Sequence, residues 1–186
     1  RKHFSVTVCV TGQHREMLDQ VLEVFDLSPE IDLRLMKQNQ TLAEVTNGVI
    51  KGVSDILKKQ KYEWVMVQGD TTSSMAAALA AFYHNVPVAH VEAGLRTWNK
   101  LSPFPEEVNR QLTSRLADLH FAPTENSRDS LKQEGVAANK IFVTGNTVID
   151  ALQWVLENIQ EPSWNLPFDP QEKRFILENY LGDTNE

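Results

Sequence analysis

Apolar and polar residues along the chain follow two spacings, one typical of buried strands and one typical of amphipathic helices. The run Trp64–Gln68 is almost unbroken in its apolar character, as expected of a central parallel strand that is buried on both faces. Strand patterns cover residues 4–10, 31–35, 64–68, 87–91, 119–122 and 140–143. Helical patterns cover residues 15–25, 41–60, 73–83, 106–116, 124–134 and 148–159.

Regular alternation of strands and helices predicts an α/β fold, a Rossmann-like parallel sheet with helices on both faces and right-handed crossovers. We expect one sheet to hold the strands that lie near Phe4, Trp64, Pro87, Leu119 and Lys140. Residues 1–159 form this predicted domain. Residues 160–186 carry three prolines up to position 170 and a strand-like piece at 174–177, so we expect a linker followed by the start of another unit.

Composition narrows the classes of partner. With 186 residues, 41% of them hydrophobic, the chain can bury one core. The formal charge is −7 and the basic residues are scattered, which argues against a nucleic-acid partner. No stretch approaches the roughly 18 apolar residues of a membrane helix, so we expect a cytoplasmic protein that does not enter membranes. Cys9 is the only cysteine, which argues against a disulfide framework or a zinc site.

Candidate chemistry lies just past the strand ends, because open α/β sheets bind ligands outside the carboxyl ends of their strands. Four such segments carry polar side chains, namely residues 11–14, 69–72, 90–96 and 144–147. Asp70 has a structural alternative as a helix N-cap, since a lone Gly-Asp-Thr-Thr is a common capping sequence. Glu92 follows an apolar strand and has no helix of its own to cap, so it is the harder of the two to explain structurally.

Other polar residues have structural explanations of similar weight. His14 and His90 fit hydrogen-bonding residues beside strand ends as well as ligands. Glu106 and Glu107 fit acids that complement the dipole of a helix N-terminus. The chain has no Gly-x-Gly-x-x-Gly, Walker A or Gly-x-Ser-x-Gly pattern, so NAD, nucleotide-triphosphate and α/β-hydrolase chemistry lack their main support. The residues alone predict a Rossmann-like binding domain with an acidic site and no cofactor or metal.

Taken in order, six segments resemble the bacterial non-hydrolysing UDP-N-acetylglucosamine 2-epimerases. They are TGQHREMLDQ from Thr11, QGDTT from Gln68, HVEAGLRT from His90, SPFPEEVNR from Ser102, HFAPT from His120 and FVTGNTVID from Phe142. The resemblance runs from Phe4 to about Trp154. It implies the N-terminal half of a two-domain fold like that of the GT-B glycosyltransferases, with the substrate in the cleft between the halves.

The reaction that the resemblance implies is inversion at C2 of UDP-N-acetylglucosamine, giving UDP-N-acetylmannosamine. UDP is eliminated to leave a glucal, and it adds back after protonation from the other face, which requires positioned carboxylates and a grip on the departing diphosphate. Catalytic roles are implied for Asp70, Glu92 and Glu106, and substrate contacts for Arg96, His90 and Asn146. An allosteric UDP-sugar site is implied at Gln13, His14 and Glu16. We also expect a homodimer.

The chain also departs from the family pattern. The resemblance implies a first strand with a Gly-Thr-Arg-Pro-Glu loop ahead of the Phe4 strand, and a second domain that supplies most uridine and diphosphate contacts. The printed sequence contains neither. We therefore expect little turnover from this chain alone. Four alternatives stay open: a domain that only binds a nucleotide sugar, a hydrolysing epimerase, half of a glycosyltransferase, and a flavodoxin-like regulatory domain without affinity for UDP-sugars.

Overall fold

A computed structural model of the protein describes residues 3–12, 15–35, 37 and 39–158. Its strands are β1 (Cys9–Val10), β2 (Ile31–Asp32), β3 (Val65–Gln68), β4 (Val88–Val91), β5 (Leu119–Ala122) and β6 (Ile141–Val143). Its α-helices are α1 (Arg15–Val24), α2 (Leu42–Lys59), α3 (Thr72–Tyr83), α4 (Glu106–Leu116), α5 (Glu125–Gln133) and α6 (Thr147–Asn158), and a short 3-10 helix spans Ala138–Lys140. Helices and strands thus alternate as the sequence predicts.

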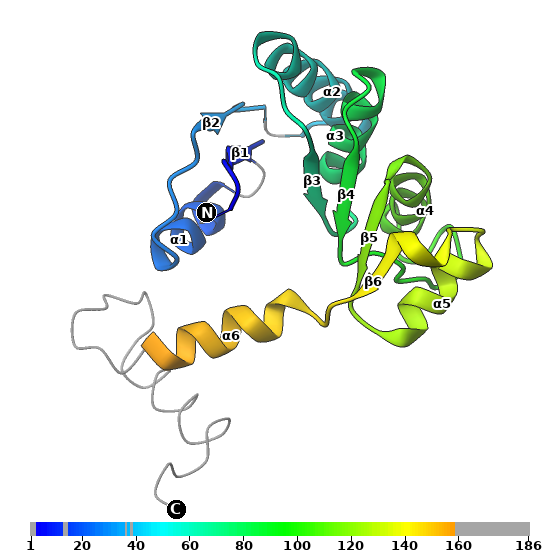
Figure 1. The fold of residues 1–186 in the computed structure, drawn as a ribbon. Helices are drawn as coiled ribbons and strands as arrows, with labels where there is room; N and C mark the ends of the chain where they lie inside the picture. The colour runs from blue at the N-terminus through cyan, green and yellow to red at the C-terminus, as the bar shows by residue number, and fades with distance from the viewer. Residues whose placement is uncertain (1–2, 13–14, 36, 38, 159–186) are drawn as a thin grey trace, which may run out of the picture.

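The main sheet contains four parallel strands in the order β3-β4-β5-β6 (Figure 1). Helix α3 packs on β3 and β4, α4 on β4, and α5 on β5 and β6. Small side chains make the closest of these contacts possible, because Ala78 and Ala81 of α3 are fully buried against Val67 and Val88. All four strands run in one direction, so their carboxyl ends lie at the same edge of the sheet and the loops after them are brought together.

Helix α2 shows how local sequence sets an element boundary. Thr41 caps its N-terminus, with the Thr41 side chain accepting from the Glu44 amide and the Glu44 carboxylate accepting from the Thr41 amide. This reciprocal pair satisfies two backbone donors that a helix start leaves free. The capping box predicted from the sequence is therefore confirmed, and the helix ends at Lys59, one residue before the predicted limit.

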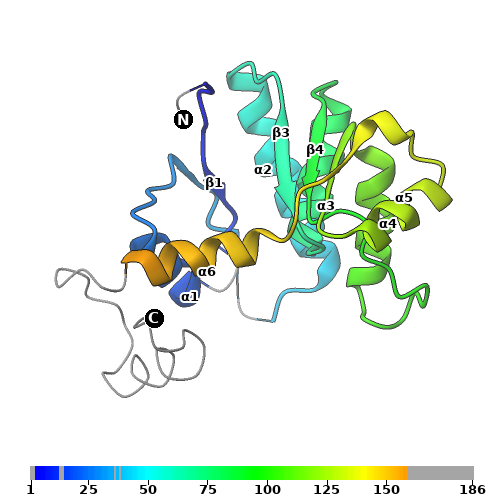
Figure 2. The same ribbon diagram turned by 60° about the horizontal axis from the view of Figure 1, so that its bottom comes forward.

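The expectation that the strand near Phe4 joins this sheet is wrong. Among the described residues, β1 pairs only with β2, in a separate two-stranded parallel sheet. Figure 2 shows β1 and β3 running in the same general direction with a gap between them. The ordered strand is also shorter than predicted, since it covers Cys9–Val10 rather than residues 4–10.

Packing on α2 explains where the small sheet sits. Gly48 and Gly52 lie one turn apart on the same face of α2, and the side chains of Leu35 and Leu33 cover them. A Cβ atom at Gly52 would come within 2.9 Å of Leu33 Cδ1, and one at Gly48 within 3.7 Å of Leu35 Cδ2. The segment after β2 is thus anchored on α2, and not on the edge of β3.

The loop after β4 packs so closely on α5 that it tolerates no side chain at Gly94. Gly94 has φ +92°, and a Cβ atom there would lie 2.2 Å from the Ser127 carbonyl oxygen. We expect Gly94→Ala to lower the free energy of unfolding by about 3 kcal/mol, from overpacking and backbone strain together. Urea unfolding followed by circular dichroism measures this loss.

Gly135→Ala is the matched control for that substitution. Gly135 has a similar φ of +88°, but nothing lies within 4 Å of its added Cβ atom. Gly135→Ala should therefore lower the free energy of unfolding only by the strain of a positive φ, about 1–2 kcal/mol. Equal losses for the two variants would contradict the close contact with Ser127.

Within the described part of the chain, every helix is too short or too polar to cross a lipid bilayer. The predicted linker over 160–186 and its strand-like piece at 174–177 lie outside the described residues.

Candidate functional site

Asp70 stands at the carboxyl end of β3 and does not cap the following helix. The N-cap of α3 is Thr71, whose side-chain oxygen accepts from the Ser74 amide at 3.2 Å. The Ser74 hydroxyl in turn donates to the Gln68 carbonyl oxygen at 2.6 Å, which ties the start of α3 to the end of β3. The structural alternative for Asp70 is thereby removed, and its carboxylate remains available for other contacts.

Two residues of α4 hold Asp70 in place. Arg110 donates from both Nε (3.0 Å) and Nη2 (2.7 Å) to the same carboxylate oxygen of Asp70. Asn109 donates from Nδ2 to the Asp70 carbonyl oxygen at 2.9 Å. Both the side chain and the backbone of Asp70 are therefore fixed by a helix that begins 36 residues later in the sequence.

Glu92 comes directly after β4, which is the neighbour of β3, and its side chain reaches the same loop. Its Oε2 atom lies 3.5 Å from the position that a Cβ atom would take at Gly69. Glu92 has φ +66°, which is uncommon for a residue other than glycine and is often found at functional positions. The structure thus brings the Asp70 and Glu92 segments together at the carboxyl edge of the sheet.

Glu106 is the first residue of α4, and its helical position relates it to Asp70. Asn109 and Arg110 follow it by three and four residues, so all three share one face of the helix. That face contacts Asp70 through Asn109 and Arg110. Glu106 therefore lies on the side of α4 that meets the Asp70 loop, at the end of the helix where backbone N–H groups favour anionic groups.

Its neighbour Glu107 is fully buried and has a different task. The Glu107 carboxylate accepts from the backbone amides of Thr97 (2.9 Å) and Trp98 (3.1 Å). It also accepts from Gln111 Nε2 at 3.0 Å, and it pairs with Arg110 at 3.4 Å. Burial alone would raise the pKa of this carboxyl group, but these hydrogen bonds outweigh burial and lower it. Glu107 thus fixes both the loop after β4 and the guanidinium that holds Asp70.

His90 is fully buried beneath the Asp70 loop. Its Nε2 atom lies 2.8 Å from the Gly69 carbonyl oxygen. Because a carbonyl oxygen only accepts, Nε2 carries the proton. Desolvation lowers the pKa of His90, which favours the neutral ring. This contact favours a positioning role for His90 over the direct substrate contact that the sequence suggests, and the substrate contact stays a prediction.

Arg96 and Asn146, the other two predicted substrate ligands, both have structural partners. The Arg96 side chain is fully buried and makes a bidentate ion pair with Glu134 at 2.6 and 2.9 Å. It also donates to Ser114 Oγ at 2.8 Å. Asn146 precedes α6 and accepts from the Val148 amide at 3.0 Å. These contacts join the loop after β4 to α4 and to the C-terminal cap of α5, and they order the start of α6.

His120, which pairs with His90 in the register of β4 and β5, should make the stability of the protein depend on pH. Its ring is 1% exposed, and desolvation, together with the nearby His90, lowers its pKa to about 4. The unfolded chain binds this proton near pH 6.5, so the folded protein is fully stable above that value and loses stability as the pH falls toward 4. We expect a loss of about 2 kcal/mol between pH 7 and pH 5, measured by urea unfolding.

Substitution separates His120 from the other titrating groups. His120→Gln should flatten this part of the pH profile, whereas His3→Gln, at an exposed position, should leave it unchanged. An unchanged slope in His120→Gln would contradict the assignment.

The predicted allosteric residues are not tested by the structure. Gln13 and His14 lie outside the described residues, and Glu16 belongs to α1. Among residues 3–12, 15–35, 37 and 39–158, no three histidine, cysteine or carboxylate side chains form a group that could hold a metal ion.

Sequence reasoning missed the residues that organise the site, namely Glu107, Asn109 and Arg110. A signal was present, because Asn109 and Arg110 follow Glu106 at helical spacing and share its face. This spacing could not be interpreted from the sequence alone, because only the structure shows that Asp70 lies opposite that face of α4.

Comparison with known proteins gives a consistent result. A family model described as UDP-N-acetylglucosamine 2-epimerase matches residues 1–180 of the chain. A UDP-N-acetylglucosamine 2-epimerase of Yersinia pestis is 56% identical over 156 residues, which is 84% of this chain and 42% of the relative. The enzyme of the same name from Escherichia coli K12 is 51% identical over 181 residues, which is 94% of this chain and 48% of the relative.

Solved structures agree with these relatives. The structure of UDP-GlcNAc 2-epimerase from Neisseria meningitidis bound to UDP-GlcNAc superposes with a TM-score of 0.81 at 52% identity, over 86% of this chain and 44% of that one. The Methanocaldococcus jannaschii enzyme in complex with UDP-GlcNAc and UDP gives 0.72 at 38% identity, over 77% of this chain and 39% of that one. The chain therefore spans less than half the length of these relatives.

Proposed function

Because the chain belongs to the UDP-N-acetylglucosamine 2-epimerase family, we propose that it supplies the N-terminal half of an enzyme that interconverts UDP-N-acetylglucosamine and UDP-N-acetylmannosamine. The observation that carries this proposal is the arrangement around Asp70. Its carboxylate is held by Arg110, and the Glu92 side chain reaches the adjacent Gly69. Carboxylates that follow two neighbouring strands, β3 and β4, thus lie at the edge where α/β sheets bind ligands.

The chemistry requires a proton to leave C2 of the sugar and return on the other face. In the first half, a carboxylate takes the C2 proton, the C–H electrons form the C1–C2 double bond, and the bond from C1 to the UDP oxygen breaks. In the second half, C2 is protonated from the opposite face and the UDP oxygen attacks C1. No water is consumed and nothing is oxidised, so the reaction needs only acid–base groups and stabilisation of UDP.

We propose that Asp70, Glu92 and Glu106 serve this proton transfer. Arg110 orients Asp70, and Glu107 orients Arg110, so the reacting groups rest on buried supports that limit their motion. His90, which donates to the Gly69 carbonyl oxygen, would fix the position of the Asp70 loop relative to the sheet. Arg96 and Asn146 would act through the loops that they order.

The test is an exchange between relatives. In the E. coli K12 enzyme, the segment that aligns with this chain is replaced by this chain; we call the product the exchanged protein. It should convert UDP-N-acetylglucosamine at a rate comparable to the parent enzyme, followed by proton NMR. In D2O the product should carry deuterium at C2. An exchanged protein that folds and binds UDP-N-acetylglucosamine but incorporates no deuterium would refute the proposal.

Three further expectations belong to this proposal: a homodimer, a cytoplasmic location, and a second UDP-sugar site near Gln13, His14 and Glu16. The family membership supports all three. Light scattering of the exchanged protein tests the dimer. A sigmoidal dependence of rate on UDP-N-acetylglucosamine, lost in Glu16→Ala, would indicate the second site, and a hyperbolic dependence would argue against it.

A further inference from the structure

A basic pocket lies at the amino-terminal edge of the main sheet, at the opposite end of β3 and β4 from the Asp70 loop. It has a volume of about 330 Å³ and is lined by residues 57–62 and 84–86. The first segment is the end of α2 and the turn that leads to β3, and the second is the turn between α3 and β4. Pockets that hold small molecules start at roughly 300 Å³, so this space is large enough for a small ligand.

The charged side chains that line this pocket are all basic. Lys58, Lys59 and Lys61 lie within four consecutive residues, and the lining residues include no aspartate or glutamate. All three lysines are exposed, and in the described ranges none of them forms an ion pair with a carboxylate. Asp55, one helical turn earlier, is engaged in another ion pair, and Glu63 does not line the pocket. Three positive charges thus gather at one point of a chain whose formal charge is −7.

Two helices end at the pocket, and their dipoles do not account for its charge. A helix carries about half a negative charge at its carboxyl end, so α2 and α3 together offset about one of the three positive charges. Lys58 and Lys59 lie in the last turn of α2, where lysines stabilise the helix end. Lys61 lies beyond that helix, after the cap residue Gln60. About two positive charges therefore remain to attract an anion.

The end of α3 forms a second wall of the pocket that is fixed by its own hydrogen bonds. Asn85 has φ +54°, and its amide donates to the Phe82 carbonyl oxygen at 3.0 Å. The Val86 amide donates to the Ala81 carbonyl oxygen at 3.0 Å, and the two bonds together form a Schellman motif. This motif holds His84 and Asn85 against the pocket, where their side chains can donate hydrogen bonds to a ligand.

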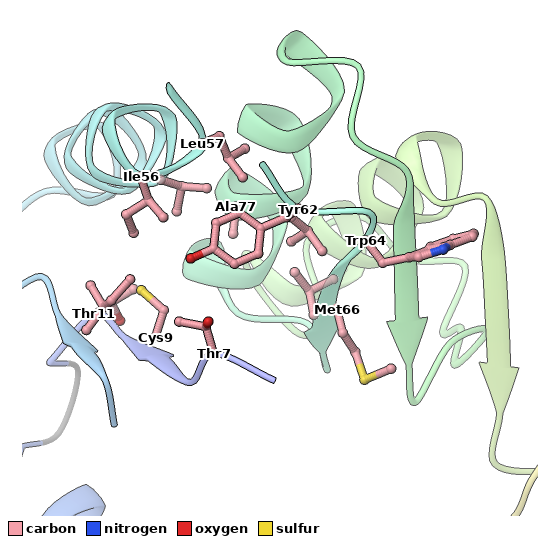
Figure 3. A pocket seen from close by; sticks show the side chains of 13 residues that line it. Thr7, Cys9, Thr11, Ile56, Leu57, Tyr62, Trp64, Met66 and Ala77 are labelled. Atoms are coloured by element: carbon pink, nitrogen blue, oxygen red, sulfur yellow. The ribbon is translucent and has the colours of Figure 1, made fainter. Parts of the chain in front are cut away.

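An apolar wall separates the lysines from the interior. Leu57 and Tyr62 line the basic pocket, and Figure 3 shows the same two side chains among those that line a second, mostly apolar cavity with Ile56 and Ala77. The three lysines line only the basic pocket. The positive charge thus lies on the solvent side of this wall, where a charged ligand can reach it without being fully desolvated.

We propose that the pocket formed by residues 57–62 and 84–86 binds a small molecule that carries a phosphate or diphosphate group. Lysine binds phosphate as a point charge, and such charge-assisted hydrogen bonds are about twice as strong as neutral ones. A ligand with two or more negative charges matches the lysines, whereas a single carboxylate leaves positive charge uncompensated. Three lysines at one point do not form the basic stripe that a nucleic-acid backbone requires. This inference does not depend on the proposed function.

Pyrophosphate is the probe, because it has the phosphate chemistry without a base or a sugar. It is titrated into the isotope-labelled 186-residue chain at about 0.15 M salt, where long-range attraction between exposed charges is largely screened. The amide NMR signals of residues 58–61 and 84–86 should shift, with half-saturation at about 1 mM or below. Signals of α5 serve as the reference and should stay in place.

A double substitution tests the lysines. Lys58→Gln together with Lys61→Gln should weaken pyrophosphate binding by about tenfold or more, because it removes two of the three charges. Glutamine keeps a long side chain and a similar helix propensity, so the fold should be unchanged. Lys132→Gln is the matched control, since Lys132 is an exposed lysine in the last turn of α5 and does not line the pocket. It should leave half-saturation where it is.

Three outcomes would overturn the proposal. Equal half-saturation in the double variant and in the unsubstituted chain would show that the lysines do not hold the ligand. Shifts that appear at about 0.02 M salt and vanish at about 0.15 M would indicate diffuse attraction to surface charge. Co-sedimentation with phosphatidylglycerol vesicles that the double variant loses, without any response to pyrophosphate, would assign the lysines to lipid headgroups.

Discussion

Asp70→Asn in the exchanged protein should reduce epimerase turnover by at least about 10²–10³-fold, which is the usual effect of removing a general acid–base or charge-stabilising group. The substitution keeps the size of the side chain and one oxygen for Arg110, but it removes the charge and most of the proton affinity. Initial rates of C2 inversion measured by proton NMR, over a range of UDP-N-acetylglucosamine concentrations, give kcat and KM separately. The loss should appear in kcat.

Asp55→Asn is the matched control, because it makes the same chemical change at a half-exposed position of α2, remote in sequence from the Asp70 loop. There Asp55 forms a surface pair with Lys51 at 2.7 Å, and such pairs contribute little to stability. Its turnover should equal that of the unsubstituted exchanged protein. If Asp70→Asn retained full activity, Asp70 would not be a catalytic residue, and urea unfolding of the same variant would then tell whether it has a structural role.

The 186-residue chain by itself should show no measurable epimerisation of UDP-N-acetylglucosamine. It spans 42–48% of the curated relatives reported above, and loss of even one good electrostatic contact to a developing charge costs about 10²–10³-fold in rate. The exchanged protein, which regains the rest of the E. coli enzyme, should be active under the same conditions. Proton NMR of both samples at equal concentration makes the comparison.

Activity in the short chain would contradict this expectation in an informative way. If turnover rose more steeply than linearly with protein concentration, two copies would be building a substitute cleft. If it rose linearly, the segments present only in the longer relatives would be dispensable for the reaction.

The limits of helices and strands, which depend mainly on neighbouring residues in the chain, could be predicted well from the sequence. The limits of α4 and β5 agree with the expected ranges, and the Thr41–Glu44 capping box marked the start of α2. The separate position of β1 could not be predicted in this way. Strand pairing depends on what lies across the edge, and the pattern of residues 4–10 carries no information about a gap beside β3.

The candidate site was predicted at the level of segments and only partly at the level of residues. Asp70 and Glu92 lie where parallel strands end, and that topological rule located both. Glu106 and Glu107 are adjacent acids in one helical turn, and their sequence does not tell which is buried. The structure separates them, because the Thr97 and Trp98 amides need an acceptor and only Glu107 reaches them.

The ion pair between Asp70 and Arg110 also has a consequence for biosynthesis. The two residues are 40 positions apart, and bacterial and eukaryotic ribosomes add roughly 5–20 residues per second. Asp70 therefore leaves the ribosome about 2–8 s before Arg110 does and cannot reach its folded state until α4 has been made. The chain must lose the conformational entropy of closing this 40-residue loop before the ion pair can stabilise it. A nascent chain that already contains β3, α3 and β4 thus carries the Asp70 loop without its Arg110 partner, and a factor that binds the growing chain at this stage meets an unpaired carboxylate there.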